Sequence, residues 1–192
     1  MGDRVCIDCI SILKENEGCL IGSSSKLMAF IHGETLPGEY VPARPFRVNC
    51  GPVHSYIMMA DGSTKYLSEV VAGDSVKIVS TSDSSGQLES RAVTVGRCKI
   101  EPRPMILVEF MDEKTGSMGQ IFLQQAETVR LMSPRLDAPD DVGVNDVSRR
   151  LWRKHHVVRP VTDLKVGEKI YVAVNEFGTH VGKRIVSNVR ER

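Results

Sequence analysis

The segment from Arg44 to Tyr56 holds the densest group of chemically useful side chains in the sequence. Arg44 and Arg47 carry planar guanidinium groups that match the geometry of a carboxylate or phosphate. Asn49 adds an amide, and His54 adds an imidazole that can move a proton near neutral pH. The segment therefore predicts an anionic small-molecule substrate bound by Arg44, Arg47 and Asn49, with His54 as catalytic acid or base. The alternative is a proline-stiffened loop whose arginines pair with nearby acids.

Two upstream patches offer further candidates. His32 and Glu34 follow a predicted strand and place an imidazole close to a carboxylate, so both are candidate catalytic residues. The small-residue loop Gly22–Lys26 can present backbone N–H groups to an anion, with Ser24 and Lys26 as substrate-binding candidates. It lacks the ending of a P-loop, and the sequence contains no GxGxxG fingerprint for a dinucleotide. Ordinary polar turns are the alternative for both patches, and a polar turn is expected at Gln124 to Thr128.

The five cysteines are odd in number and show no disulfide framework, which favours reduced thiols in an intracellular protein. Cys6 and Cys9 form a CxxC sequence, but no second pair or histidine motif follows to complete a zinc site. The surrounding residues read as a strand, on which positions three apart point to opposite faces. We therefore expect buried structural thiols and no metal.

Composition narrows the possible partners. The 192 residues include 25 basic and 24 acidic side chains, with a formal net charge of +1 and 41% hydrophobic residues. This balance excludes a disordered chain and argues against a dedicated nucleic-acid binder. The longest apolar run, Leu27 to Ile31, falls far short of the roughly 20 residues that span a bilayer. With no signal peptide visible, we expect a cytoplasmic protein that binds neither nucleic acid nor membranes.

Alternating and β-branched stretches dominate, and no long capped helix pattern appears. We therefore predict a mainly β fold, barrel-like or sandwich-like, with minor helix. Residues 1–60 are expected to form a β-rich segment carrying the substrate loop, and residues 61–192 a small β-barrel-like domain. The predicted strands are Arg4–Ile10, Gly18–Ile21, Leu27–His32, Val53–Met59, Ser75–Val79, Arg91–Lys99, Met105–Phe110, Gly119–Leu123, Thr128–Met132, Lys169–Val174 and Thr179–Val189.

A weak internal repeat relates Leu67–Ile78 to Val161–Val172. Each copy has hydrophobic anchors, then a glycine followed by an acidic residue, then an alternating strand. Glycine can adopt the positive φ that such a turn requires. We therefore predict the same turn in both copies, although this unit opens strands in many small barrels and names no function.

The stretch from Asp137 to Pro160 has a different character. An acidic run is followed by a basic cluster, Arg149 to His156, which contains the only tryptophan, Trp152. Charge runs of this kind are usually solvated, so an inserted loop at residues 137–160 is favoured. The alternative is a patch that contacts nucleic acid or a partner, in which case the chain would be a non-enzymatic β-barrel binding module.

The run from Gly22 to Ile57 resembles type II 3-dehydroquinate synthase, a family of archaea with plant and algal relatives. The resemblance covers nearly the whole chain but only the C-terminal half of such enzymes, which combine an α/β region with a β region. The Asp137–Pro160 loop departs from the pattern, and Cys50 stands where the family usually has alanine. The matching residues are Gly22–Ser25, His32–Thr35, Tyr40–Asn49, Gly51–Tyr56, Tyr66–Glu69, Val95–Arg97, Lys99–Glu101, Leu123–Gln124, Ala126–Leu131 and Leu164–Val172.

The resemblance implies an oxidoreductase acting on a CH–NH2 group. Such enzymes convert 2-amino-3,7-dideoxy-D-threo-hept-6-ulosonate to 3-dehydroquinate by NAD-dependent oxidative deamination and cyclisation, in the shikimate route to aromatic amino acids. Because family members are about twice as long, we expect a fragment that is inactive alone, with the missing N-terminal half as a partner chain. NAD is the implied cofactor, and the implied compartment is the cytoplasm, or the plastid in a plant or alga.

A second alternative is a Hint-type autoprocessing domain. Cys50, followed by Asp61–Lys65 and Val70–Val76, is similar to the first block of such domains, in which a nucleophilic cysteine opens a β-fold. The Thr-x-x-His block and the terminal His-Asn pair of those domains do not appear. This alternative is therefore weaker than the synthase resemblance.

Overall fold

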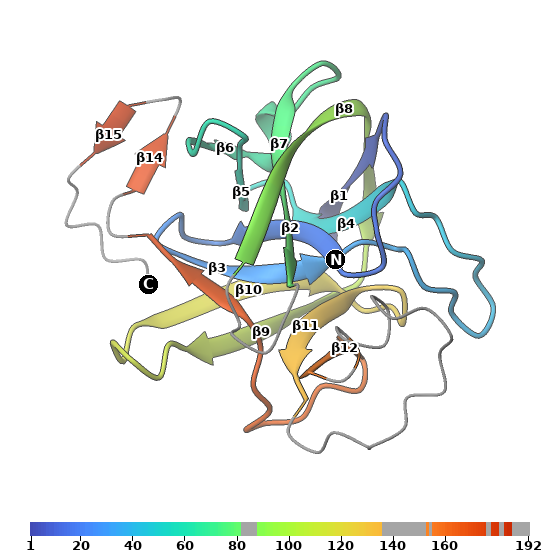
Figure 1. Ribbon diagram of the computed structural model, residues 1–192, viewed down its shortest axis with the longest axis vertical. Helices are drawn as coiled ribbons and strands as arrows, with labels where there is room; N and C mark the ends of the chain where they lie inside the picture. The colour runs from blue at the N-terminus through green and yellow to red at the C-terminus, as the bar shows by residue number, and fades with distance from the viewer. Residues whose placement is uncertain (82–87, 136–152, 154, 176–177, 181–182, 186–192) are drawn as a thin grey trace.

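The computed structural model describes residues 1–81, 88–135, 153, 155–175, 178–180 and 183–185 (Figure 1). The described strands, together with the 3-10 helix η1 (Leu67–Glu69), follow the chain in order. They are β1 (Gly2–Cys9), β2 (Glu17–Gly22), β3 (Leu27–His32), β4 (Arg47–Pro52), β5 (Tyr56–Met58), β6 (Thr64–Tyr66), β7 (Ser75–Thr81), β8 (Leu88–Arg103), β9 (Met105–Met111), β10 (Met118–Gln124), β11 (Arg130–Pro134), β12 (His156–Pro160), β13 (Val172–Val174), β14 (Gly178–His180) and β15 (Lys183–Ile185).

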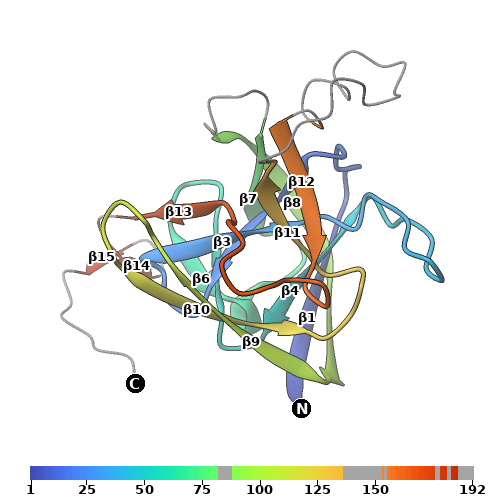
Figure 2. The ribbon, with the colours of Figure 1, turned by 90° about the horizontal axis from the view of Figure 1, so that it is seen from below.

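Eleven strands form one antiparallel sheet in the order β12-β11-β3-β2-β7-β8-β1-β4, with β13 on β3 and the β5–β6 pair on β2. The sheet is strongly curled, and the separate β9–β10 hairpin packs against its concave side (Figure 1, Figure 2). β14 and β15 form a second hairpin. The prediction of a mainly β fold is therefore confirmed.

β3 shows why the longest apolar run belongs at the centre of this sheet. Leu27, Ala29 and Ile31 pack into the larger hydrophobic core, whereas Met28 and Phe30 pack into a smaller core on the other face. A strand buried on both faces needs apolar residues at every position, and not only at alternate ones. The continuous run is thus a central strand.

The internal repeat forms the same turn twice. Gly73 and Gly167 have φ values of 94° and 91°, a region that other residues rarely adopt. In each copy the side chain of the acidic residue after the glycine accepts the backbone N–H of the residue three positions before that acidic residue, at 3.0 Å. The acidic residue's own N–H donates back to that residue's carbonyl, at 3.2 and 3.1 Å. The predicted turn is confirmed in both copies.

Several predicted boundaries were wrong. The segment expected to be a substrate loop contains β4, which begins two residues after Pro45 and ends at Pro52. It lies at the edge of the sheet, where proline is tolerated. Of the strand predicted at Val53–Met59 only β5 forms, and β13 is shorter than predicted. β6 and β12 were not predicted. The strand expected at Thr179–Val189 is instead a hairpin, and its last residues lie outside the described part.

The segment boundary expected after residue 60 falls between β5 and β6, which pair with each other. β1 also pairs with β8, and β2 with β7, so strands from both expected segments share one sheet. Most of the expected 137–160 loop, including Trp152, lies outside the described residues. Its last five residues are not loop but strand β12, paired with β11.

The cysteines behave as predicted. Cys6, Cys9, Cys19 and Cys50 are buried, Cys98 is half-buried, and none forms a disulfide. Burial raises the pKa of the Cys9 thiol to about 12, so this sulfur stays protonated near neutral pH. No helix in the described part of the chain is long and apolar enough to cross a membrane.

Candidate functional site

Strand β1 carries a polar face. Arg4, Cys6 and Asp8 alternate along it and therefore point to one side of the sheet, whereas Val5 and Ile7 point into the hydrophobic core. All three polar-face side chains are buried. Charged groups are seldom buried unless they are paired, so the strands on either side must supply partners.

Asp8 binds an arginine from each neighbouring strand. The register places it opposite Arg47 of β4 and Arg97 of β8. Arg47 donates from Nε and Nη2 to the two carboxylate oxygens at 2.6 and 2.9 Å, and Arg97 donates to Oδ2 from Nε at 2.9 Å and from Nη2. Burial raises the pKa of Asp8, but the arginine hydrogen bonds outweigh it, so its net pKa lies below the ordinary value. Arg47 is thereby held in one position.

The loop after β3 adds Glu34 and Arg44 to this face. The Glu34 N–H donates to the Arg47 carbonyl at 2.8 Å, and the Arg44 N–H donates to the Glu34 carbonyl at 2.7 Å. Arg44 Nη1 then donates to Glu34 Oε2 at 3.1 Å. Burial raises the pKa of Glu34, and the guanidinium groups of Arg44 and Arg47 only partly offset this. The arrangement joins a carboxyl of raised pKa to an arginine whose side chain is 36% exposed.

Two buried polar atoms on this face have no hydrogen-bond partner. Asn49 donates from Nδ2 to Gln124 Oε1 at 2.9 Å, but its Oδ1 is unpaired. Arg4 donates from Nη2 to Glu101 Oε2 at 2.6 Å, but its Nε is unpaired. An unsatisfied buried group costs roughly 1–3 kcal/mol. The face therefore holds one acceptor and one donor that a ligand could satisfy.

We call this face the arginine cluster. It carries six cationic side chains and three carboxylates, joined by ion pairs, and this excess of positive charge favours an anionic ligand. The cations are Arg4, Arg44, Arg47, Arg97, Lys99 and Arg103, and the carboxylates are Asp8, Glu34 and Glu101.

The structure brings four of the eight predicted site residues into the cluster, namely Glu34, Arg44, Arg47 and Asn49. His54 lies beside it, exposed in the turn between β4 and β5. Its ring meets Phe122 edge-on with centroids 6.1 Å apart. Phe122 is two residues before Gln124, the partner of Asn49, so β10 contacts both predicted residues along the same strand.

The other three predicted residues lie elsewhere. His32 shares the alternation of Met28 and Phe30, on the opposite face of β3, and its Nε2 donates to the Glu15 carbonyl at 2.5 Å. Burial lowers the His32 pKa to about 4, so the ring is neutral at neutral pH. Ser24 and Lys26 lie in the turn before β3, separated from Glu34 by the length of that strand, roughly 20 Å.

The residues that sequence reasoning missed include Arg4, Asp8 and Gln124. The first two were detectable, because polar residues alternate with Val5 and Ile7 along a predicted strand. Gln124 was expected in a polar turn but is the last residue of β10. Its role depends on the packing of β10 against β4, for which the local sequence carries no signal. In the described residues no group of three or more His, Cys, Asp or Glu side chains is arranged to hold a metal.

Comparison with known proteins gives a consistent result. The model of the 3-dehydroquinate synthase II C-terminal domain matches residues 1–192. Proteins named 3-dehydroquinate synthase from Methanobrevibacter smithii and Methanocaldococcus jannaschii are each 42% identical over 191 residues, which is all of this chain and 45% of theirs. The protein of that name from Halobacterium salinarum is 39% identical over 190 residues, or 42% of its length. The chain thus spans less than half the length of these relatives. No solved structure matches the chain.

Proposed function

This chain belongs to the 3-dehydroquinate synthase II family, whose C-terminal domain it matches over its full length, and on that premise we propose that its arginine cluster binds the substrate of that reaction. The substrate would be 2-amino-3,7-dideoxy-D-threo-hept-6-ulosonate, which carries a carboxylate. The reaction would be its oxidative deamination and cyclisation to 3-dehydroquinate. The observation that carries the proposal is the partly exposed Arg44 fork beside the buried Glu34, in a face with excess positive charge.

The contacts of each residue in the arginine cluster suggest a different role for it. Arg44 makes a single side-chain bond, to Glu34, and has further N–H groups to clamp the substrate carboxylate. Arg47 is held by Asp8 and acts as a positioning residue. Glu34, whose pKa is raised by burial, is suited to holding or releasing a proton during cyclisation. His54 is exposed at the edge of the cluster and is a second candidate for this step.

The oxidation would require NAD as hydride acceptor. The described residues do not fit a dinucleotide site of the parallel βαβ kind, because the described strand pairs are antiparallel. We therefore derive no step through NAD from this chain. We propose that NAD is held chiefly by the N-terminal part of the relatives, which this chain does not match and which would act as its partner.

Neither alternative function is favoured. A Hint-type reaction needs an accessible thiolate, but Cys50 is fully buried and burial raises its pKa well above the ordinary value. The binding-module alternative depends on the Arg149–His156 cluster, most of which lies outside the described residues. Within the described part, Arg153 pairs with Glu15 at 2.9 Å, and His156 is buried.

Calorimetric titration of the chain with 2-amino-3,7-dideoxy-D-threo-hept-6-ulosonate tests the proposal. Arg44→Gln should weaken binding by about tenfold or more, because it removes a charged fork from the carboxylate. Arg44→Lys should give an intermediate loss, since the charge remains but the fork does not.

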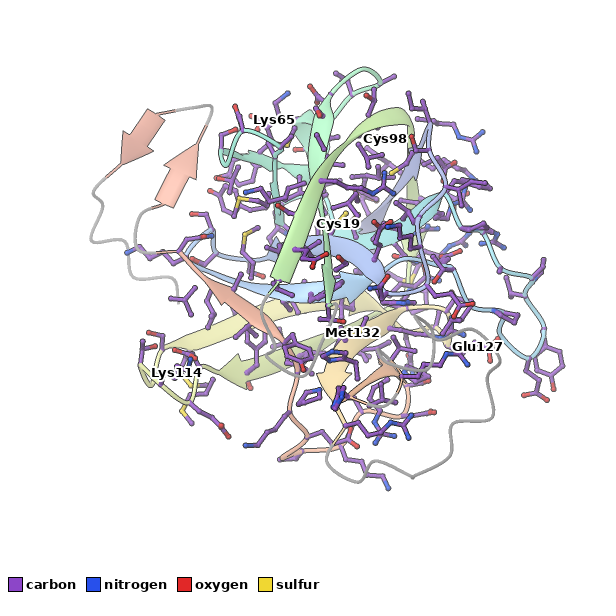
Figure 3. The ribbon with its side chains drawn as sticks, in the orientation of Figure 1. Cys19, Lys65, Cys98, Lys114, Glu127 and Met132 are labelled. Atoms are coloured by element: carbon purple, nitrogen blue, oxygen red, sulfur yellow. The ribbon has the colours of Figure 1, made fainter. Side chains whose placement is uncertain are left out.

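Lys114→Gln is the matched control. Lys114 is an exposed cation in the turn between β9 and β10, at the opposite end of β10 from Gln124 (Figure 3). Its replacement should leave substrate affinity unchanged, and circular dichroism should show all three variants folded. Equal affinity of the wild type and Arg44→Gln would refute the role of the arginine cluster.

A further inference from the structure

A cavity of about 440 Å³ lies between the β11–β12 hairpin and the repeat turn at Gly167. The hairpin and the chain leading from β12 towards β13 run side by side (Figure 1, Figure 2). No residue of the arginine cluster lines this cavity, which lies at the other end of the strand order. It is therefore a separate site.

Strand register explains which side chains face the cavity. Ser133 pairs with Val157, and Leu131 pairs with Arg159. Because residues alternate between faces, Ser133 and Arg135 share the face of Leu131, together with Val157 and Arg159. Lys169 and Glu168 close the cavity from the repeat turn.

Two of these groups are buried polar atoms with no hydrogen-bond partner. Ser133 is only 3% exposed, and its Oγ is unpaired. The Nε of Arg135 is also buried and unpaired. Both can donate a hydrogen bond, and leaving them unsatisfied costs free energy. An anion with several oxygens in the cavity offers an acceptor to each of these donors.

The charges around the cavity also favour an anionic ligand. Arg135, Arg159 and Lys169 line it, against the single carboxylate Glu168. Arg159 Nε lies 3.8 Å from Glu168 Oε1, and Lys169 pairs with Glu113 at 3.1 Å where both side chains are largely exposed. Exposed pairs of this kind contribute little, so these cations remain free to turn towards a ligand.

We propose that this cavity binds a small oxyanion of the carboxylate or phosphate class. Ser133 Oγ and Arg135 Nε donate to its oxygens, and Arg159 and Lys169 balance its charge. The proposal goes beyond the synthase function, because it requires neither the arginine cluster nor the synthase substrate. In this site the Glu168 carboxylate competes with the ligand for Arg159.

Calorimetric titrations of the chain with inorganic phosphate and with malonate, at constant ionic strength, test the site. Saturable binding of either anion is expected, and the tighter of the two shows whether phosphate or carboxylate is the natural ligand chemistry. Arg135→Gln and Arg159→Gln should each weaken binding by about tenfold. Glu168→Gln should tighten binding several-fold, because it removes the competing charge yet keeps an acceptor for the Lys165 N–H.

The control is Lys65→Gln, since Lys65 lies on β6 far from the β11–β12 hairpin (Figure 3). It should leave anion affinity unchanged. If Arg135→Gln does not fold, the loss of anion affinity is measured with Arg159→Gln, since Arg159 is half-exposed. Glu168→Gln is expected to raise anion affinity, a result that a damaged fold could not produce. The proposal is overturned if neither anion binds saturably, or if the Arg159 and Glu168 variants bind as the wild type does.

Discussion

Arg44 and Arg47 lie close together in the sequence but differ in how many of their N–H groups are already bonded. Arg47 is fixed by the two hydrogen bonds that it donates to Asp8, whereas Arg44 donates to Glu34 through one nitrogen and is partly exposed. An arginine held on both prongs of its fork has few donors left for a ligand. We therefore propose that the substrate-binding role predicted for both belongs mainly to Arg44. Arg47 holds the loop backbone at Glu34 by accepting its N–H at the Arg47 carbonyl.

His32 makes a testable contribution to the pH dependence of stability. Its pKa is lowered to about 4 in the folded protein by burial, against about 6.5 unfolded. Between these values the unfolded chain binds a proton that the folded chain does not, so stability falls as pH drops from 6.5 towards 4. We predict that the wild type loses about 3 kcal/mol more across this range than His32→Gln does.

Urea unfolding at pH 7 and at pH 4.5 measures this difference. Glutamine suits the position because its amide can still donate to the Glu15 carbonyl. An equally steep pH dependence in both proteins would show that His32 is not buried as a neutral ring.

Residue types alone identified Glu34, Arg44, Arg47 and Asn49 as candidates, and the structure groups them. The same reasoning placed His32 beside Glu34, because adjacency in sequence was taken as adjacency in space. A continuing strand would put positions 32 and 34 on one face, but β3 ends at His32. Glu34 lies in the loop beyond it, where its N–H donates to the Arg47 carbonyl. The partners of these residues, Asp8 and Gln124, come from distant strands and could not be read locally.

Among the elements, β4 determines whether the cluster forms, since it carries both Arg47 and Asn49. Its position depends on Gly51, which has a φ of 105° and lies against β10. A Cβ at this position would lie 2.7 Å from the Phe122 carbonyl oxygen, a backbone atom that cannot move alone. The glycine thus allows β4 and β10 to approach closely enough for Asn49 to reach Gln124.

Gly51→Ala should therefore lower the free energy of unfolding by about 3 kcal/mol, combining the positive-φ strain with the clash. Gly62→Ala is the matched control, because Gly62 also has a positive φ, 87°, but its added Cβ meets nothing within 4 Å. It should cost only about 1 kcal/mol. Guanidinium denaturation measures both, and similar losses in the two variants would contradict the close approach of β4 to β10.

The existence of most strands could be predicted from alternation and turn signals, and the repeat turns at Gly73 and Gly167 from their spacing. β4 was missed because the prolines of the Arg44–Tyr56 segment were interpreted as signs of a stiffened loop. Proline removes one backbone donor, which matters little where no further strand pairs on that side. Only knowledge that β4 lies at the sheet edge would have allowed a strand there.

At the scale of the whole molecule, the two cationic sites occupy opposite ends of one sheet. The arginine cluster lies on β4, β1 and β8, and the anion cavity lies at β11 and β12. The mainly β class followed from composition and periodicity, but this strand order did not. Pairs such as β1 with β8 join segments about ninety residues apart, and local patterns do not specify such partners.

The arginine cluster and the antiparallel sheet together predict how the chain behaves in isolation. We expect the 192-residue chain to bind 2-amino-3,7-dideoxy-D-threo-hept-6-ulosonate in an Arg44-dependent way but to form no NADH from it. Hydride transfer needs the acceptor held in contact with the substrate, and the described antiparallel sheet does not fit a dinucleotide crevice. Absorbance of NADH measures turnover.

Addition of the unmatched N-terminal part of the Methanobrevibacter smithii relative, as a second chain, is expected to start NADH formation. In that mixture Arg44→Gln should lower kcat/KM by about tenfold or more, and Lys114→Gln should not change it. The control separates a lost substrate contact from a general loss of surface charge. NADH formation by the chain alone, in proportion to its concentration, would instead require that this β domain hold both substrate and acceptor, and would place the dinucleotide site within it.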